Sequence, residues 1–309
     1  MQVFLPIAHM DVNLLLMLAF GAVVGFLSGL VGVGGGFLIT PLLIFSGVPP
    51  IVAVATGSTQ IVGTSASGSY AHWRLGNVDV RMALMLLTGS WLGGAVGVLL
   101  AHLLQRGGQF GNIVTFLYVV LLGVIGASML LESLRAGRRA RQAPPPASGP
   151  RLFERMTALI QRLPGQMRFP VSGLEISFLV PVVVGAAVGV LTALMGVGGG
   201  FLMVPVMIYL LRIPTNVVVG TSLFQLLFTT AGVSVMQAGI NHAVDPLLAV
   251  VLIVGSAFGT QRGARMGMKL PGERLRLILA LVVVAVAIRM LMTLLITPDE
   301  LFDMVRVVR

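Results

Sequence analysis

The chain has 309 residues, of which 57% are hydrophobic and only 10% are charged, and its mean hydropathy is +1.01. A soluble domain carries about 25% charged residues, so this composition excludes an ordinary soluble enzyme and indicates a protein that spans a membrane. The net charge of +10 would suggest nucleic-acid binding in a soluble protein, but here the basic residues lie between apolar segments. The chain has no cysteine, which excludes disulfides and thiolate metal sites.

Several apolar segments approach or reach the roughly 20 residues that a spanning helix needs. The first segment has no basic residues before it, so we expect it to be retained as a helix rather than removed as a signal peptide. The sequence therefore predicts an all-α polytopic membrane protein. The long apolar segments are 14–30, 82–103, 113–131, 176–195, 217–235, 247–264 and 277–296, and the short ones are 37–45 and 201–211.

The two halves of the chain repeat one another. Residues 21–41 and 185–205 are identical at 14 of 21 positions, and both contain Gly-Val-Gly-Gly-Gly-Phe-Leu and end in proline. Further identities follow in the same order at offsets of 165 and 166, so the match extends over about 77 residues. Such ordered identities indicate a tandem duplication, which is a common basis of transporter architecture.

A basic linker separates the repeats. Residues 133–172 contain eight arginines and one glutamate, with a proline-rich run at 143–150. Apolar residues then recur at helical spacing from 152 to 163, which is typical of an amphipathic helix on a membrane surface; a disordered linker is the alternative. We therefore divide the chain into membrane repeat 1 (1–132), a cytoplasmic Arg/Pro-rich linker with an amphipathic helix (133–172), membrane repeat 2 (173–297) and a C-terminal tail (298–309).

The distribution of Lys and Arg predicts how the repeats are oriented. With the linker in the cytoplasm, an odd number of crossings in each half puts 16 of the 20 basic residues on the cytoplasmic side, as the positive-inside rule expects. Four crossings per half would move the five basic residues of 262–276 outside. Odd repeats in tandem have opposite orientations. We therefore expect two inverted repeats of about five helical segments each, some short or re-entrant, with both termini outside.

The first candidate site is the pair of glycine runs, which would form broken helices at the repeat interface. Each run separates a long apolar helix from a short one, so it leaves backbone N–H groups and a helix N-terminus available to an anion. Irregular backbone at membrane depth is tolerated only beside protein or a water-filled cavity. A tight packing kink would explain the same glycines without a ligand. The candidate substrate-binding residues are Gly34, Gly35, Gly36, Gly198, Gly199 and Gly200.

The second candidate site is a polar stripe in each repeat. Three residues spaced i, i+4 and i+8 share one helix face, and a membrane helix turns such a face to the interior of the bundle. Neutral hydroxyls and amides replace the hydration of an anion without trapping it; hydrogen bonding between helices, worth about 0.6–2 kcal/mol per contact, is the alternative. The stripe residues are Thr56, Gln60 and Thr64 in the first repeat and Thr221, Gln225 and Thr229 in the second.

A few other residues have candidate roles. His72 and Arg74 end a predicted helix near the cytoplasm, and Arg289 lies in the last apolar segment, so each is a candidate accessory residue with an interfacial anchor as the alternative. Asp245 is expected to cap the helix that begins at Pro246. Two glycine ladders, at 89/93/97 and 255/259/263, predict close helix crossings.

At these residues the chain resembles the TauE/SafE family of sulfite and organosulfur anion transporters. The resemblance covers residues 14–135 and 173–296. It rests on the paired glycine runs that end in proline, on Ala55-Thr56-Gly57-Ser58 and Gly220-Thr221-Ser222, and on His72-x-x-x-Gly76-x-Val78-Asp79. The second repeat departs from the last motif, because Gln237 stands near the position equivalent to His72. The resemblance implies an inner-membrane carrier of sulfite, sulfonates or similar small anions.

Taken with this resemblance, the sequence predicts a secondary transporter, working as an exporter of a small sulfur-containing anion across the bacterial cytoplasmic (inner) membrane. Its partners would be the anionic substrate and the lipid bilayer, with a proton gradient as a candidate driving force and no nucleic acid. An anion channel is an alternative, since a pore also needs polar stripes and inward half-helices. An intramembrane enzyme is a weaker alternative, because no H-E-x-x-H or G-x-S-x-G motif is present. The sequence also has no Walker A motif, which argues against transport driven by ATP. We therefore expect neither an enzymatic activity nor a cofactor or metal.

Overall fold

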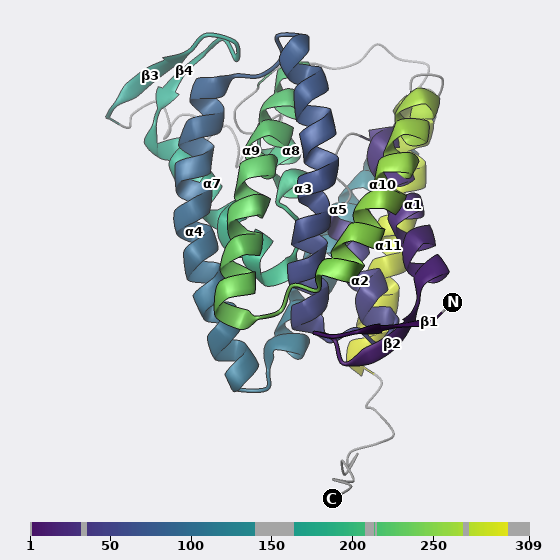
Figure 1. Cartoon of the computed structure of the whole chain (residues 1–309). Helices are drawn as coiled ribbons and strands as arrows, with labels where there is room; N and C mark the ends of the chain where they lie inside the picture. The colour runs from purple at the N-terminus through teal and green to yellow at the C-terminus, as the bar shows by residue number, and fades with distance from the viewer. Residues whose placement is uncertain are drawn as a thin grey trace, which may run out of the picture.

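The computed structural model describes residues 2–31, 36–139, 164–207, 213, 215–267 and 272–295. In this part of the chain the structure consists of helices and two short β-hairpins (Figure 1). The expectation of an all-α membrane protein is therefore confirmed for the body of the fold. The hairpins were not expected.

Both halves are built from the same series of elements. The first half contains β1 (Gln2–Leu5), β2 (Met10–Asn13), α1 (Leu14–Val31), α2 (Gly36–Phe45), α3 (Pro50–Arg74), α4 (Val80–Arg106) and α5 (Phe110–Arg139). The second half contains β3 (Gln166–Phe169), β4 (Leu174–Ser177), α7 (Leu179–Met195), α8 (Gly200–Pro205), α9 (Thr215–Met236) with the π-helical turn η2 (Gln237–Asn241), α10 (Pro246–Gly267) and α11 (Gly272–Leu295).

The helices agree with the apolar segments of the sequence, with three differences. Helix α3, which carries the first polar stripe, has no counterpart among the apolar segments. Residues 176 and 177, expected at the start of a spanning segment, belong to β4, and α7 begins at Leu179. The short segment expected at 201–211 is helical only to Pro205; residues 206 and 207 continue as π-helix, and 208–211 lie outside the described residues. The amphipathic helix expected in the linker and the C-terminal tail also lie outside them.

Four described segments are long and apolar enough to cross a membrane by their length and composition, and shorter apolar helices accompany them. Large apolar side chains also cover the outward faces of these helices. Leu92, Val124 and Phe258, for example, are each more than 60% exposed, which would be costly in water and is expected against lipid. These observations support an integral membrane protein. The four segments are Val80–Arg106, Phe110–Leu130, Val217–Asn241 and Pro246–Gly263.

Helices of one half pack mainly against helices of the other half. The most extensive contacts are those of α1 with α10 and of α4 with α7, so the first helix of each half packs along the fourth helix of the other half. Helices α3 and α9, which occupy equivalent places in the two repeats, pack against each other, and so do α5 and α11. Neither half therefore forms a bundle of its own, and the core is made by both together.

Glycine ladders allow the α1–α10 and α4–α7 helix pairs to approach closely, as the sequence predicts. A Cβ placed on Gly93 would lie 2.0 Å from the carbonyl oxygen of Ala186, and one on Gly259 would lie 2.0 Å from that of Ala22. Since no side chain fits at such a distance, these backbones touch only because the residues are glycine. The predicted role of the ladders in packing is confirmed at these positions.

The two hairpins lie at opposite ends of the bundle (Figure 1). Each is antiparallel and has a four-residue turn, with Leu5 opposite Met10 in one and Phe169 opposite Leu174 in the other. Each is followed directly by the first long helix of its half, so α1 and α7 start from opposite ends. The last helix, α11, ends at the same end of the bundle as the β1–β2 hairpin (Figure 1).

Candidate functional site

The polar stripes lie where the two repeats meet. They are carried by α3 and α9, which pack against each other in the middle of the bundle. All six side chains are buried: Thr64 is 6% exposed and the other five are 0% exposed. Polar groups buried at membrane depth need partners, so the hydrogen bonds of each stripe residue distinguish a packing role from a ligand-binding role.

The threonine that comes first in each stripe has a hydrogen-bond partner in the other repeat. Thr56 Oγ1 accepts a hydrogen bond from the backbone N–H of Asp245 (3.2 Å), and Thr221 Oγ1 accepts one from the backbone N–H of Asp79 (3.0 Å). Each threonine thus ties its own helix to the start of a helix in the other repeat. For this pair the structure supplies the helix–helix hydrogen bonding that sequence analysis gave as the alternative.

Asp79 and Asp245 themselves connect the hairpins to the bundle. Asp79 accepts from the N–H of Met82 at the start of α4, and its other oxygen accepts from both the N–H and the hydroxyl of Ser172 in the β3–β4 turn. Asp245 caps α10 through the N–H groups of Leu247 and Leu248, which confirms the predicted cap, and it also accepts from the N–H of Ile7 in the β1–β2 turn.

The central glutamine of the second stripe is partly satisfied. Gln225 Nε2 donates to the hydroxyl oxygens of Ser90 (2.7 Å) and Thr229 (2.8 Å), while its carbonyl Oε1 has no partner among the described residues. Ser90 was not among the residues selected from the sequence. The signal was present, because the pair Gly89-Ser90 recurs as Gly255-Ser256 at the repeat offset.

The central glutamine of the first stripe is not satisfied at all. Gln60 is 0% exposed, yet neither its amide nitrogen nor its carbonyl oxygen finds a hydrogen-bond partner in the described part of the chain. Leaving such a buried amide unpaired costs about 1–3 kcal/mol for each polar group. A fold retains a cost of this size where a ligand or water supplies the missing bonds, so Gln60 is the stripe residue that most clearly points to a ligand.

The glycine run of the second repeat lies beside this stripe. Gly196 ends α7 in a left-handed conformation, and Gly198 and Gly199 also have positive φ values of 73° and 72°. A Cβ on Gly198 would lie 2.9 Å from the side chain of Ile61, the neighbour of Gln60, and 3.4 Å from that of Thr230. The backbone of this run therefore passes between α3 and α9.

The described part of the other glycine run meets it. Gly36 begins α2, and a Cβ there would lie 3.0 Å from the carbonyl oxygen of Val197. Gly200 begins α8, while Gly34 and Gly35 lie outside the described residues. A buried tyrosine also fixes this region, since Tyr118 Oη on α5 donates to the carbonyl oxygen of Met195 at the end of α7 (2.6 Å). Tyr118 lies outside the residues that the sequence patterns indicate.

The accessory candidates lie elsewhere. His72 is half-buried in the last turn of α3, beside Gly220 at the start of α9, and its Nδ1 has no partner among the described residues. Arg74 is exposed at the same helix end. Arg289 on α11 places its guanidinium 5.7 Å from the ring centroid of Phe45, a cation–π contact at the end of α2. The structure does not bring these three residues together.

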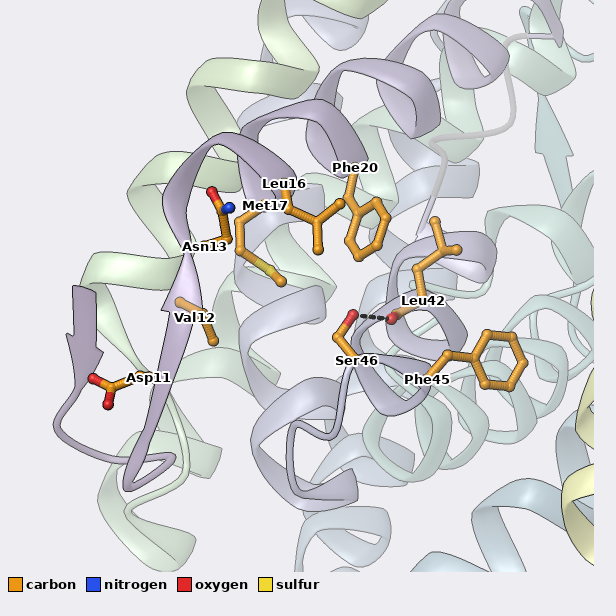
Figure 2. Close-up of a pocket in the computed structure, with 9 residues that line it drawn as sticks. All are labelled: Asp11, Val12, Asn13, Leu16, Met17, Phe20, Leu42, Phe45 and Ser46. Atoms are coloured by element: carbon orange, nitrogen blue, oxygen red, sulfur yellow. Dashed lines mark hydrogen bonds between the residues drawn. The ribbon is translucent and has the colours of Figure 1, made fainter. Parts of the chain in front are cut away.

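A pocket of about 380 Å³ lies close to Phe45, between the β1–β2 hairpin, α1 and the end of α2 (Figure 2). Its wall is mainly apolar, and the hydroxyl of Ser46 is bonded to the carbonyl oxygen of Leu42. No cluster of His, Asp or Glu able to hold a metal ion is found among the described residues. The pocket residues are Asp11, Val12, Asn13, Leu16, Met17, Phe20, Leu42, Phe45 and Ser46.

Comparison with known proteins decides the family. The family model described as "Sulfite exporter TauE/SafE" matches residues 17–290, which include both stripes and both glycine runs. The chain belongs to the TauE/SafE family. The resemblance seen in the sequence is thereby confirmed over most of the chain. No solved structure is a significant match.

The relatives with full-length matches are described as transporters. The chain is 26% identical over 287 residues to "Probable membrane transporter protein YunE" of Bacillus subtilis, covering 90% of this chain and 97% of that protein. It is 30% identical over 288 residues to a "Probable membrane transporter protein" of Xylella fastidiosa (strain Temecula1), covering 89% and 94%. A shorter match, 32% over 94 residues, covers 30% of this chain and 19% of "Sulfite exporter TauE/SafE family protein 3" of Arabidopsis thaliana.

Proposed function

We propose that this TauE/SafE protein is a secondary transporter that exports a small sulfur-containing anion across the bacterial cytoplasmic membrane. The observation that carries the proposal is the pair of buried glutamines at the meeting of the repeats. Gln60 has a free amide and a free carbonyl, and Gln225 has a free carbonyl, all without partners among the described residues. The buried glycine run at 196–199 brings irregular backbone beside Ile61, the neighbour of Gln60, and broken helices of this kind form binding sites in other transporters.

The charges around this site favour a small, weakly charged anion. Among the described residues, the buried charged side chains are Asp79 and Asp245, and both are occupied in capping helices and holding hairpins. A site with amides and hydroxyls but no fixed cation can replace the water around a monoanion and still release it. It offers much less to a dianion, whose desolvation costs more, so the argument favours hydrogensulfite over the fully deprotonated sulfite dianion.

An inverted arrangement of the repeats is part of the same proposal. The hairpins that precede α1 and α7 lie at opposite ends of the bundle, and each half supplies the packing partner of the other. With the arginine-rich linker in the cytoplasm, this arrangement puts both termini outside. Two equivalent halves around one central site would suit alternating access, with the lipid bilayer as surroundings and a proton gradient as the candidate energy source.

The test is uptake of labelled sulfite into proteoliposomes that contain the purified chain, with sulfate, thiosulfate, a sulfonate and a carboxylate as competitors. Saturable uptake that accelerates when the vesicles are preloaded with unlabelled sulfite would support a carrier. Uptake that is neither saturable nor stimulated by preloading would indicate a channel. No uptake of sulfite, or of any of the other anions when each is labelled in turn, by folded protein with or without a proton gradient would contradict the proposed function.

A further inference from the structure

The two repeats hold their central glutamines differently. Gln225 on α9 is bonded through Nε2 to Ser90 on α4, whereas Gln60 on α3 has no partner in the described chain. The serine equivalent to Ser90 is Ser256 on α10, and its hydroxyl donates to the carbonyl oxygen of Ile253 in its own helix. Both serines are fully buried. Equivalent residues of the two repeats therefore differ in whether they make this contact.

Ser90 is built to hold the amide end of a glutamine. Its hydroxyl donates to the carbonyl oxygens of Leu86 (2.8 Å) and Gly185 (3.0 Å), so its single proton is used by the backbone. Only its lone pairs remain for Gln225, which must turn Nε2 towards Ser90 and leave Oε1 free. Ser90 thus joins α4, α7 and α9 and fixes which end of the Gln225 amide is available.

Ser256 has a backbone environment similar to that of Ser90. Ser256 lies where α10 crosses α1, and its backbone carbonyl oxygen would lie 2.3 Å from a Cβ on Gly25, just as that of Ser90 would lie 2.2 Å from a Cβ on Gly189. Helix α10 also contacts α3, which carries Gln60. The backbone settings of the two serines are therefore similar, but their hydroxyl hydrogen bonds differ. Ser90 also donates across to α7 and accepts from Gln225, whereas Ser256 donates within its own helix.

We propose that Ser90 and Ser256 are positioning residues that hold the two site glutamines alternately. In the conformation seen here Ser90 retains Gln225, and Gln60 presents both ends of its amide to the substrate. In the alternative conformation Ser256 retains Gln60, and Gln225 is released. The proposal rests on the proposed transport function and assigns each glutamine to one conformation. It gives the substrate at least one full amide in each, able to donate to an anion oxygen.

Single cysteines can report the two conformations, because the chain contains no native cysteine. Ser69 on α3 and Ser234 on α9 are equivalent positions at the repeat offset of 165, and they are 4% and 8% exposed. Ser69→Cys and Ser234→Cys therefore place one small thiol towards the end of each stripe helix. The rate of alkylation of each thiol in the full chain, reconstituted without substrate, measures how often that end opens.

The experiment adds Ser90→Ala or Ser256→Ala to each reporter. We expect Ser90→Ala to raise the rate several-fold at one reporter and lower it at the other, and Ser256→Ala to do the reverse. Gln225→Leu removes the other partner of the same hydrogen bond and should change the alkylation rates as Ser90→Ala does. The double variant Ser90→Ala/Gln225→Leu should show the same rates as either single variant. Shifts in the same direction for both serines, or independent effects of Ser90 and Gln225, would overturn the proposal.

These readouts separate this proposal from the transport function. Alkylation rates in the absence of substrate test the exchange of glutamines even if sulfite is not the substrate. Conversely, sulfite flux with alkylation rates that neither serine changes would support the transporter and reject the exchange. The melting temperature of each variant shows whether it has lost its fold. If a serine variant does not fold, the glutamine variants Gln225→Leu and Gln60→Leu replace it. These two variants are expected to shift the alkylation rates of the two reporters in opposite directions.

Discussion

The backbone N–H of Asp79 donates a 3.0 Å hydrogen bond to Thr221 Oγ1, which joins the first residue before α4 to the middle of the other repeat. The equivalent bond runs from Asp245 to Thr56 over 3.2 Å. Each aspartate also holds the hairpin at its own end of the bundle, through Ser172 or Ile7. At each end of the molecule an aspartate thus connects a threonine hydroxyl of the central helices, the start of a helix and a hairpin.

Replacing either threonine by valine is expected to weaken the fold. Thr221→Val and Thr56→Val keep the shape of the side chain but leave a buried backbone N–H of an aspartate without its acceptor, at a cost of about 1–3 kcal/mol. The measurement is the melting temperature of each purified variant in detergent. Thr221→Ser and Thr56→Ser retain the oxygen and should melt close to the wild type. Valine variants that melt normally but fail to bind sulfite would contradict this structural assignment.

Two glycines in membrane helices should respond in opposite ways to alanine. A Cβ at Gly93 would lie 2.0 Å from the carbonyl oxygen of Ala186, so Gly93→Ala must push α4 and α7 apart and should cost about 1–3 kcal/mol or more. A Cβ at Gly123 on α5 meets nothing within 4 Å, so Gly123→Ala should be neutral or stabilise the protein by about 0.5–1 kcal/mol. Melting temperatures compare the two. Equal losses of stability would show that the α4–α7 crossing is not so close.

The glutamines should affect transport more than stability. Gln60→Ala removes an amide that makes no hydrogen bond within the described chain, so the variant should melt near or above the wild type and lose at least ten-fold in sulfite uptake. Gln225→Ala also loses two hydrogen bonds, to Ser90 and Thr229, and should lose both uptake and some stability. Normal uptake by both variants, measured per folded molecule, would show that the stripe serves packing alone.

The anion itself provides a further prediction. Because the buried stripe has hydroxyls and amides and the described core has no buried cationic side chain, sulfate should compete poorly against a monoanion. Competition of sulfite uptake by sulfate and by methanesulfonate, at equal concentration and constant pH, measures the difference. We expect methanesulfonate to reduce uptake several-fold more than sulfate does. Equal competition would indicate a fixed positive charge at the site that the described residues do not contain.

Much of this fold follows from patterns that are visible in the sequence. Apolar length locates most of the helices, although not α3, the glycine ladders predict close crossings on α4 and α10, and Asp245 before Pro246 predicts the start of α10. These features depend on local chemistry and on spacing along one helix. The repeat also predicts which residues are equivalent, and the structure uses Asp79 and Asp245 in equivalent ways.

The hairpins and the serine contacts do not follow from the sequence, for a physical reason. Residues 2–13 and 166–177 are short, and their strands are stabilised by long-range bonds to Asp79 and Asp245 rather than by their own composition. A signal did exist, since Gln2 and Pro6 recur as Gln166 and Pro170 at the repeat offset. The bond between Ser90 and Gln225 joins residues 135 apart, and only the packing of α4 on α9 shows it.

The orientation of the hairpins gives the most direct test of the inverted arrangement. Asp11 lies in β2, and Val171, which is 40% exposed, lies in the turn between β3 and β4 at the other end of the bundle. With the linker in the cytoplasm, Asp11→Cys should react in intact cells with a maleimide that does not cross membranes, and Val171→Cys should react only after the membrane is permeabilised. The wild type, which has no cysteine, gives the background.

Labelling of both variants in intact cells, or of neither, would place the two hairpins on the same side and reject opposite orientations of the repeats. Labelling of Val171→Cys alone would keep the inversion and reverse the sidedness, putting both termini in the cytoplasm.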